Sequence, residues 1–210
     1  ILFVNGNYWS RAFEDLVPKF DDNMVWAFHY YSWMVNAPVS KNTIQYLIDL
    51  RKNTNTPLWL GETGENSNEW FVQLRTLIEQ NNIGWAWWNY KKIGTINAPV
   101  SSPTDPVYQE ILNYWGGSGS KPNFDRSLLG LNNMVENLKF ENCDLRKDVV
   151  ASLLSKDFQA KEIPYKSYSI PGKVEFVDYD LGSLGVAYYD RDFIDDRSDG
   201  GSYKAWNKGY

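Results

Sequence analysis

Four short apolar runs, none with a strict alternation of polar residues, occupy the first 89 residues of this chain. They cover residues 1–5, 24–31, 57–62 and 83–89, so that successive runs start 23 to 33 residues apart. Continuous apolar runs of this length are typical of strands that are buried on both faces, as in parallel sheets. A βα unit needs about 30 residues. The spacing therefore predicts consecutive βα units and an α/β fold.

Helical patterns lie between these runs. Ser40 can cap one helix, and either Asn66 or Ser67 can cap another. The apolar stripes of the two helices consist of Ile44, Leu47 and Ile48, and of Trp70, Leu74, Leu77 and Ile78. A parallel sheet closes as a barrel or stays open and doubly wound. No glycine-rich phosphate loop follows any run, which disfavours the dinucleotide-binding form of the open sheet.

The chain beyond the fourth run has a different texture. We expect a long loop over residues 91–122, interrupted by a short helix at 107–114, and long loops are usually functional or flexible. Two more helices are predicted, capped by Asp125 and Asp144. Their apolar faces consist of Leu128, Leu131, Val135 and Leu138, and of Leu145, Val149, Leu153 and Leu154. From residue 174 onward, short Tyr/Val runs between Gly and Asp indicate β-structure.

Composition excludes several classes of function. The net charge is −5 and the chain has no Lys/Arg-rich run, which argues against nucleic acid or an anionic membrane as the main partner. A single cysteine, Cys143, excludes an internal disulfide, and a single histidine, His29, disfavours a Ser-His-Asp triad or a multi-histidine zinc site. Aromatic residues make up 16% of the chain, with 10 Trp and 14 Tyr. Such rings stack on sugars, but they also build cores and interfaces.

Side-chain alternation predicts which residues meet at the end of the sheet. In a parallel β/α barrel, catalytic side chains lie at the carboxyl ends of the strands. Three same-face sets are predicted: Leu58, Leu60 and Glu62; Val25, Ala27, His29 and Tyr31; and Gly84, Ala86 and Trp88. We therefore expect Glu62, His29, Tyr31 and Trp88 to converge at one mouth. An acid, a histidine, a phenol and an indole suit sugar chemistry, with Glu62 attacking the anomeric carbon, Tyr31 aligning it and Trp88 supporting a sugar face.

Structural alternatives exist for three of these residues. Glu62 could cap a helix or be a solvated loop acid, and His29 could be a hydrogen-bonded core residue. Trp88 could pack between the sheet and its helices, and this packing is what we predict for Trp85 and Trp87. Trp26 and Tyr30 have the opposite orientation in their strand and are expected in the core.

Three of the four runs resemble strands of the family 5 glycoside hydrolases, the cellulase-type retaining (β/α)8 enzymes. "MVWAFHYYSW" resembles the sixth strand, "PLWLGETGEN" the seventh and "NNIGWAWWNYKK" the eighth, and "ILFVNGNYW" then resembles the fifth. The resemblance covers about residues 1–160 and implies the C-terminal half of a (β/α)8 barrel. It implies that Glu62 is the nucleophile and that His29 and Tyr31 form the family's His-x-Tyr motif. The implied substrate-binding residues are Trp88, Asn5, Asn7, Trp9 and Lys91.

The family also carries an acid/base Glu in an Asn-Glu-Pro motif on its fourth strand. No Asn-Glu-Pro occurs here, because Asn68-Glu69 is followed by Trp70. Glu65 is the nearest other carboxyl, but it follows the strand end on the turn into the helix. The resemblance thus implies a missing N-terminal half, in the same chain or in a second one. We expect residues 1–210 alone neither to hydrolyse β-glucan nor to fold as a clean monomer, because the two outer strands would be unpaired.

The tail resembles the opening of a family 6 carbohydrate-binding module, a β-sandwich. The resemblance lies in "IPGKVEFVDYDLGSLGVAYYD" and implies that residues 161–210 hold a linker and the N-terminal part of the module. Val177 stands where this family usually has an acid that helps to bind a structural calcium, so no cofactor and no metal site are expected. An acidic loop follows, but its spacing is not that of an EF-hand, and it is interpreted as a solvated loop. The loop consists of Asp190, Asp192, Asp195, Asp196 and Asp199.

Taken together, the two resemblances imply part of a secreted, cell-surface or periplasmic retaining glycosidase acting on β-glucan, with an appended sugar-binding module. Two other classes stay open: a carbohydrate-binding protein that has lost catalysis, and an α/β enzyme of different chemistry.

Overall fold

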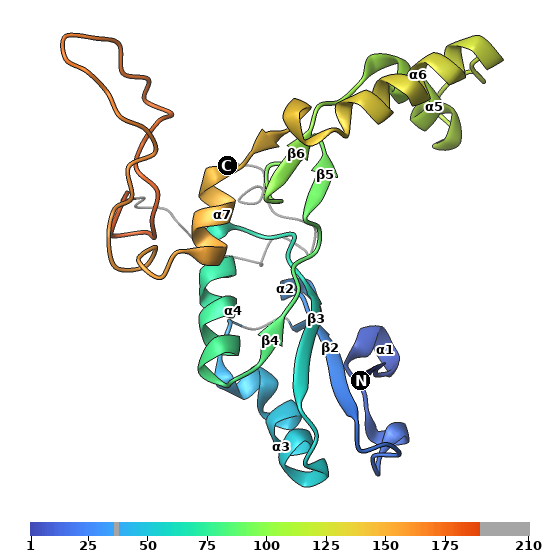
Figure 1. Ribbon diagram of the computed structural model, residues 1–210, viewed down its shortest axis with the longest axis vertical. Coiled ribbons are helices and arrows are strands. Elements are labelled where there is room, and N and C mark those ends of the chain that lie inside the picture. Colours follow the sequence, from blue (N-terminus) through green and yellow to red (C-terminus); the bar gives the residue numbers. More distant parts are fainter. Residues whose placement is uncertain (36–37, 190–210) are drawn as a thin grey trace. The chain divides into compact units, whose positions relative to one another are not determined.

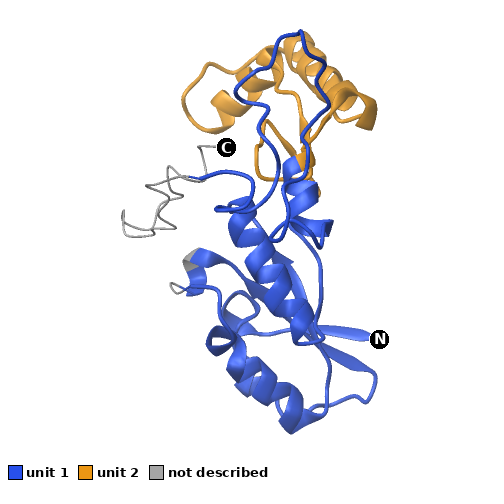
Figure 2. Ribbon diagram, turned by 90° about the vertical axis from the view of Figure 1, so that its left-hand side faces the viewer, with its two compact units in different colours: residues 1–88, 148–210 blue, residues 89–147 orange. Residues whose placement is uncertain are grey.

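The computed structural model describes residues 1–35 and 38–189 of the chain. The chain forms two compact units (Figure 2): unit 1 consists of Ile1–Trp88 and Asp148–Tyr210, and unit 2 of Asn89–Lys147. Residue 160, the predicted boundary between barrel and module, lies inside unit 1, and that division stays a prediction. Within the described residues, no helix combines the length and the apolar character that crossing a membrane requires.

Unit 1 contains a four-stranded sheet whose strands follow one another in chain order (Figure 1). They are β1 (Leu2–Asn5), β2 (Met24–Tyr30), β3 (Leu58–Thr63) and β4 (Gly84–Trp85), and every neighbouring pair is parallel. The four apolar runs are thus confirmed as parallel strands, and the sheet is consistent with part of a (β/α)8 barrel. The last strand is shorter than predicted, because beyond Trp85 the chain meets β3 only at separate points. The N–H of Ala86 donates to the Leu60 carbonyl (2.8 Å) and the N–H of Trp88 to the Thr63 carbonyl (2.7 Å).

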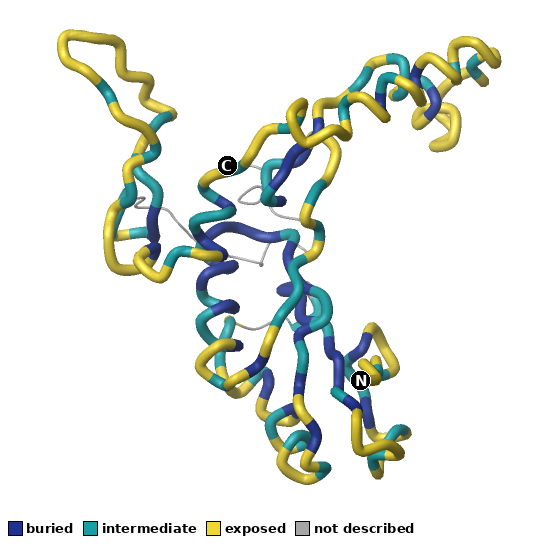
Figure 3. The backbone as a smooth tube through the Cα atoms, in the orientation of Figure 1, coloured by how far each residue is buried: buried dark blue, intermediate teal, exposed yellow. Residues whose placement is uncertain are grey.

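Helices α3 (Gln45–Thr54), α4 (Asn68–Gln80) and α7 (Lys147–Leu154) contribute to one apolar core with this sheet. The buried segments of the strands and of α4 are visible in Figure 3. Each large apolar side chain that is fully buried contributes about 1.5–3 kcal/mol. The core includes Trp26, Phe28, Leu58, Leu60, Leu47, Phe71, Leu74, Ile78, Val149 and Leu153. The short elements of unit 1 are α1 (Asn7–Ser10), η1 (Glu14–Leu16), α2 (Ser32–Val35) and η2 (Lys41–Ile44).

The helix starts confirm one predicted cap and correct another. The Ser67 hydroxyl accepts a hydrogen bond from the N–H of Trp70 (3.2 Å) and caps α4, as predicted. Ser40 makes no side-chain cap, and the α-helix begins only at Gln45. The reason is that the N–H of Thr43 bonds the Ser40 carbonyl (3.1 Å), which makes the first turn the 3-10 helix η2.

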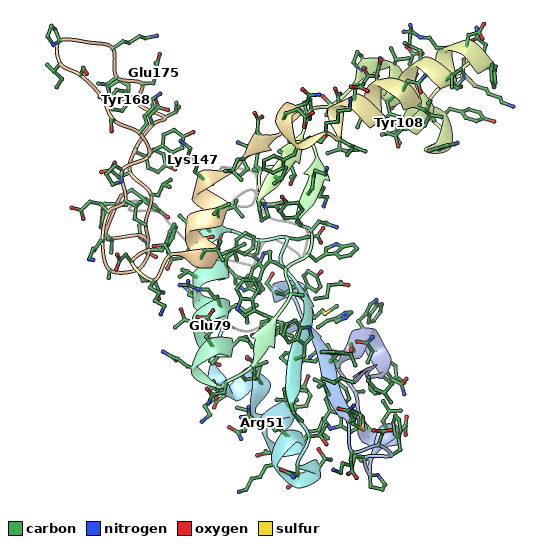
Figure 4. The ribbon with its side chains drawn as sticks, in the orientation of Figure 1. Arg51, Glu79, Tyr108, Lys147, Tyr168 and Glu175 are labelled. Carbon is green, nitrogen blue, oxygen red and sulfur yellow. The ribbon has the colours of Figure 1, made fainter. Side chains whose placement is uncertain are left out.

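Polar side chains tie the helices of unit 1 to its turns. Arg51 on α3 and Glu79 on α4 are labelled in Figure 4. Arg51 Nη1 donates to the Asn81 carbonyl (2.7 Å), and Trp85 Nε1 donates to Glu79 Oε1 (3.1 Å). Both bonds involve the stretch that leads from α4 into β4, so they fix where the last strand begins.

Unit 2 has a second sheet, formed by β5 (Lys91–Ile93), β6 (Val100–Ser102) and β7 (Asp144–Leu145). β5 and β6 are parallel, and β7 is antiparallel to β6. The predicted long loop over residues 91–122 is therefore wrong, because two strands of this sheet lie within it. The predicted short helix is confirmed as α5 (Pro106–Trp115), which is capped by Asp105.

Two predicted helix caps in this region are wrong. α6 (Phe124–Asn137) is capped by Asn123, whose side chain accepts from the N–H of Arg126 (2.8 Å), so Asp125 lies inside the first turn. Asp144 belongs to β7, and α7 begins at Lys147. An acidic residue near a helix start suits the helix dipole as well as the cap position, and sequence alone did not separate the two. The unit also contains η3 (Phe140–Asn142).

The described residues after α7 contain turns and two isolated bridges, between Ile163 and Leu181 and between Leu184 and Tyr188. The β-sandwich module stays a prediction. The predicted acidic loop, residues 190–199, lies outside the described residues.

Candidate active site

A β-bulge at Gly61 decides where Glu62 points. In the pairing of β2 with β3, Phe28 lies opposite Leu60 but His29 lies opposite Glu62, so that Gly61 is an extra residue. A bulge of this kind shifts the alternation of the strand and re-aims the side chain that follows. Glu62 therefore lies on the same face as His29.

This corrects one predicted set. Leu58 and Leu60 do not share the face of Glu62, since both are buried in the core with Trp26 and Phe28. The prediction counted an unbroken period of two through Gly61, whereas the bulge breaks that period. Glu62 and His29 do lie on one face, as predicted, but the alternation that was used to place Glu62 there is wrong. The sequence did carry a signal, because a glycine inside a strand pattern suggests a bulge.

The faces of β2 are as predicted. Tyr30 points to the helices: its hydroxyl lies 2.8 Å from Thr43 Oγ1, and its ring packs against Trp70. Trp26 also points there, because its Nε1 donates to Thr54 Oγ1 on α3 (3.0 Å). His29, between them in the alternation, points away from the helices.

Two predicted residues, Tyr31 and His29, lie around the carboxylate of a third, Glu62. The Tyr31 hydroxyl donates to Glu62 Oε1 (2.8 Å), and His29 Nδ1 lies 3.9 Å from the same oxygen. Tyr31 is buried, whereas the side chains of His29 and Glu62 are 22% and 32% exposed. The carboxylate is thus oriented by a buried phenol and still reachable from solvent. A carboxylate held in this way can act as a nucleophile or accept a proton.

The turn after Glu62 places Trp88 at the same strand end. Gly64 has φ 134° and bridges to Trp88, and a Cβ on Gly64 would lie 2.1 Å from the Trp88 carbonyl oxygen. Only glycine allows the two backbones to approach so closely. Trp88 is 48% exposed, whereas Trp85 and Trp87 pack against the core as predicted. Trp88 therefore has an aromatic surface available beside the strand that carries Glu62.

Three predicted residues lie at the end of β1. Asn5 Oδ1 accepts from the Ser10 hydroxyl (3.1 Å), Asn7 Nδ2 donates to Asp15 Oδ2 (3.2 Å), and Trp9 is 70% exposed. Because β1 is parallel to β2 and β3, its carboxyl end lies at the edge of the sheet where His29 and Glu62 are found.

Lys91 is the one predicted residue in unit 2. It lies in β5, and its ammonium group donates to the carbonyl of Leu138 in the same unit. It is not among the residues that unit 1 gathers around Glu62, and its part in a site stays a prediction.

Sequence reasoning missed Ser10, Gly61 and Gly64. The two glycines stand beside Glu62 and could have been found as breaks in a strand pattern. Ser10 gave no signal, because its importance comes from partners in other elements. Within residues 1–35 and 38–189, no three His, Cys, Asp or Glu side chains are grouped as they would be around a metal ion.

Comparison with known proteins gives one family match. Residues 1–94 match the family model described as Cellulase (glycosyl hydrolase family 5). A solved structure of an endo-β-1,4-glucanase from Xanthomonas axonopodis pv. citri, a triple mutant, is 15% identical, with a TM-score of 0.31. That comparison covers 59% of this chain and 41% of the other, so the chain spans less than half of that protein's length. No curated protein matches the chain. Residues 1–94, and with them the whole group around Glu62, are similar to the family 5 glycosyl hydrolases.

Proposed function

We propose that this chain carries the nucleophile side of a retaining glycosidase that cleaves β-glucan. The observation that carries the proposal is the hydrogen bond from Tyr31 to Glu62, at the end of a parallel strand and within the residues that match the cellulase family model. The bond holds one carboxylate oxygen in place and so aims the carboxylate outward from the sheet.

In the proposed reaction, a carboxylate oxygen of Glu62 forms a bond to the anomeric carbon while the bond to the glycosidic oxygen breaks. The leaving oxygen takes a proton from a second carboxylic acid, which in retaining enzymes lies about 5–5.5 Å from the nucleophile. Water then attacks the anomeric carbon and gives a proton to that second carboxylate, while the bond to Glu62 breaks. His29, beside Glu62, is proposed to orient the sugar or the carboxylate.

The substrate class follows from the surroundings of Glu62. The half-exposed Trp88 offers a flat face on which a pyranose ring can stack. We propose a β-glucan such as cellulose as the substrate, which also implies action outside the cytoplasm, where the polymer is met. Asn5, Asn7 and Trp9 are proposed to line the path of the glucan.

The proton donor is proposed to come from a partner half-barrel, in a second chain or in a longer form of this one. The sequence contains no Asn-Glu-Pro. This same observation favours a second candidate function, that of a protein which binds β-glucan without cleaving it.

A mechanism-based label separates the two functions. A fluorinated β-cellobioside with a dinitrophenyl leaving group needs no proton donor, because dinitrophenolate departs unaided and the glycosyl ester then persists. We expect mass spectrometry of the treated chain to find one glycosyl group on Glu62, and none in Glu62→Gln. Glu65→Gln is the matched control and should be labelled like the wild type. A chain that binds cellohexaose without being labelled would support the binding protein, and a label on Glu65 would overturn the assignment of Glu62.

A further inference from the structure

The turn after β1 has an unusual backbone. Tyr8, Trp9 and Ser10 have φ values of 50°, 53° and 59°, so three consecutive residues with side chains adopt the left-handed conformation. L-residues visit this region singly, because the Cβ crowds the next carbonyl oxygen, and a run of three accumulates that cost. Elsewhere in the described residues, non-glycine residues with positive φ occur one at a time, at Asn55, Glu65 and Asn82.

Ser10 holds this turn in place. Its side chain is buried, with 3% of the residue exposed. Its Oγ accepts from the N–H of Gly6 (3.1 Å) and lies within donor distance of Asn5 Oδ1 (3.1 Å) and of the Ala27 carbonyl (2.5 Å). Ala27 is the residue of β2 that pairs with Asn5 and lies two positions before His29. One hydroxyl thus joins the turn to the strand that carries His29.

The base of the turn is closed by the backbone. The N–H of Asn7 donates to the Ala12 carbonyl (2.7 Å), and the N–H groups of Arg11 and Ala12 donate to the Asn7 carbonyl (2.9 and 3.1 Å). The strained residues are therefore clamped from both sides, which is what a costly backbone conformation needs in order to persist.

Two of the three strained residues bury little in return. Tyr8 is 77% exposed and Trp9 is 70% exposed. A turn that served only to connect β1 to β2 could use glycine at these positions at a lower cost. Strain kept together with exposed aromatic rings, at the sheet edge where Glu62 lies, indicates a function for the rings.

We propose that the left-handed turn Tyr8–Ser10 is a preorganised aromatic platform for a sugar unit of the glucan, with Ser10 as its positioning residue. The inference rests on the proposed function and adds Tyr8 and Ser10 to it. Fixing the backbone that carries the rings before binding lowers the entropy that is lost when a sugar stacks on them. The protein gives up stability in this turn and gains affinity.

If the turn gives up stability to gain affinity, one substitution should change these two quantities in opposite directions. Tyr8→Gly relieves left-handed strain, so the denaturation midpoint of the full chain should rise, by about 2–4 °C. The same change removes one ring, so the affinity for cellohexaose in isothermal titration calorimetry should fall roughly tenfold, as for a lost stacking contact. Asn55→Gly is the matched control: it replaces an isolated left-handed residue at the end of α3, φ 48°, and should raise the midpoint slightly while leaving the affinity unchanged.

Ser10→Ala tests the positioning role. It should lower both the midpoint and the affinity for cellohexaose, although the serine itself is buried and cannot touch a sugar. The inference is overturned if Tyr8→Gly raises the midpoint with unchanged affinity, which is the behaviour of a plain connecting turn. It is also overturned if Tyr8→Gly lowers the midpoint, since the turn would then carry no strain to relieve.

Failure of the proposed function gives a different pattern. If the wild-type chain unfolds cooperatively, and so is folded, but neither takes the glycosyl label nor binds cellohexaose, the proposed function is wrong and the platform is wrong with it. If the wild type is labelled and binds, while Tyr8→Gly and Ser10→Ala bind equally well, only the platform falls.

Discussion

The turns after β1 and after β3 leave the same edge of one parallel sheet, but they handle a left-handed backbone in different ways. After β3, the most constrained position is glycine: Gly64 has φ 134°, and the Trp88 backbone leaves no room for a Cβ. After β1, the left-handed positions are Tyr8, Trp9 and Ser10, held by hydrogen bonds of Ser10. After β3, glycine is used where the backbones touch, and a single residue with a side chain, Glu65 (φ 54°), is left-handed beside it. After β1, three consecutive residues keep their side chains, and two of these are aromatic rings exposed to solvent.

The largest expected effect on stability comes from replacing Gly64, the glycine in the turn after β3. Gly64→Ala should lower the free energy of unfolding by about 2–5 kcal/mol, because it combines a left-handed strain with a contact of 2.1 Å to backbone. Urea denaturation of the full chain measures the loss. Gly61→Ala is the control on the same strand, since its Cβ would meet Trp59 and Ala27 at ordinary distances of 3.6 and 3.7 Å. A similar loss for both variants would contradict the role given to the Trp88 contact.

The second largest effect on stability is expected from removing the Ser10 hydroxyl, which holds the turn after β1. Ser10→Ala should cost about 1–3 kcal/mol of unfolding free energy, because the partly buried N–H of Gly6 loses its acceptor and the buried Ala27 carbonyl loses its donor. Ser152→Ala is a control of similar burial: its hydroxyl bonds the Val149 carbonyl one turn back in its own helix (2.8 Å) and has only a longer contact, 3.4 Å, to Asn68 Oδ1 on α4. Its removal should cost about 1 kcal/mol or less. Equal losses would mean that Ser10 does not hold a strained turn.

The smallest effect compares the aromatic rings that the two turns display. Trp88→Ala should weaken cellohexaose binding by about 0.5–1.5 kcal/mol, the scale of an aromatic contact, with little change in thermal stability. Trp9→Ala should weaken binding by a similar amount. Calorimetry gives the affinities, and thermal denaturation gives the stabilities. A large loss of stability with unchanged affinity in Trp88→Ala would show that this residue serves packing and does not bind sugar.

Local patterns predicted the strands and most of the helices. The four apolar runs became β1 to β4 in parallel order, and Ser67 caps α4 as expected. The errors lie where a local signal has two meanings. Asp125 suits either a cap or a first turn, and residues 91–122 are rich in loop-forming residues but contain β5 and β6. These two strands are short, and pairing with each other and with β7 is what makes them strands.

The candidate site was also predictable from the sequence only in part. That a carboxylate stands at the end of a buried strand is evident from the order of residues 57–66, and so is the nearness of His29, Tyr31 and Trp88 to strand ends. The roles of these residues in catalysis and binding stay predictions. The face that Glu62 takes was not predictable from alternation, because Gly61 is accommodated as a bulge only when β3 is in register with β2.

By itself, the sequence determined the elements whose signal is local: apolar runs that must be buried and helix faces with a period of 3.6 residues. The tertiary structure alone decided the direction of Glu62 and the left-handed turn at Tyr8–Ser10. Both depend on bonds to residues far away in the chain, since Tyr31 is 31 positions from Glu62 and Ala27 is 17 positions from Ser10. A conformation that is unfavourable locally persists only when such distant partners stabilise it, and no local pattern records them.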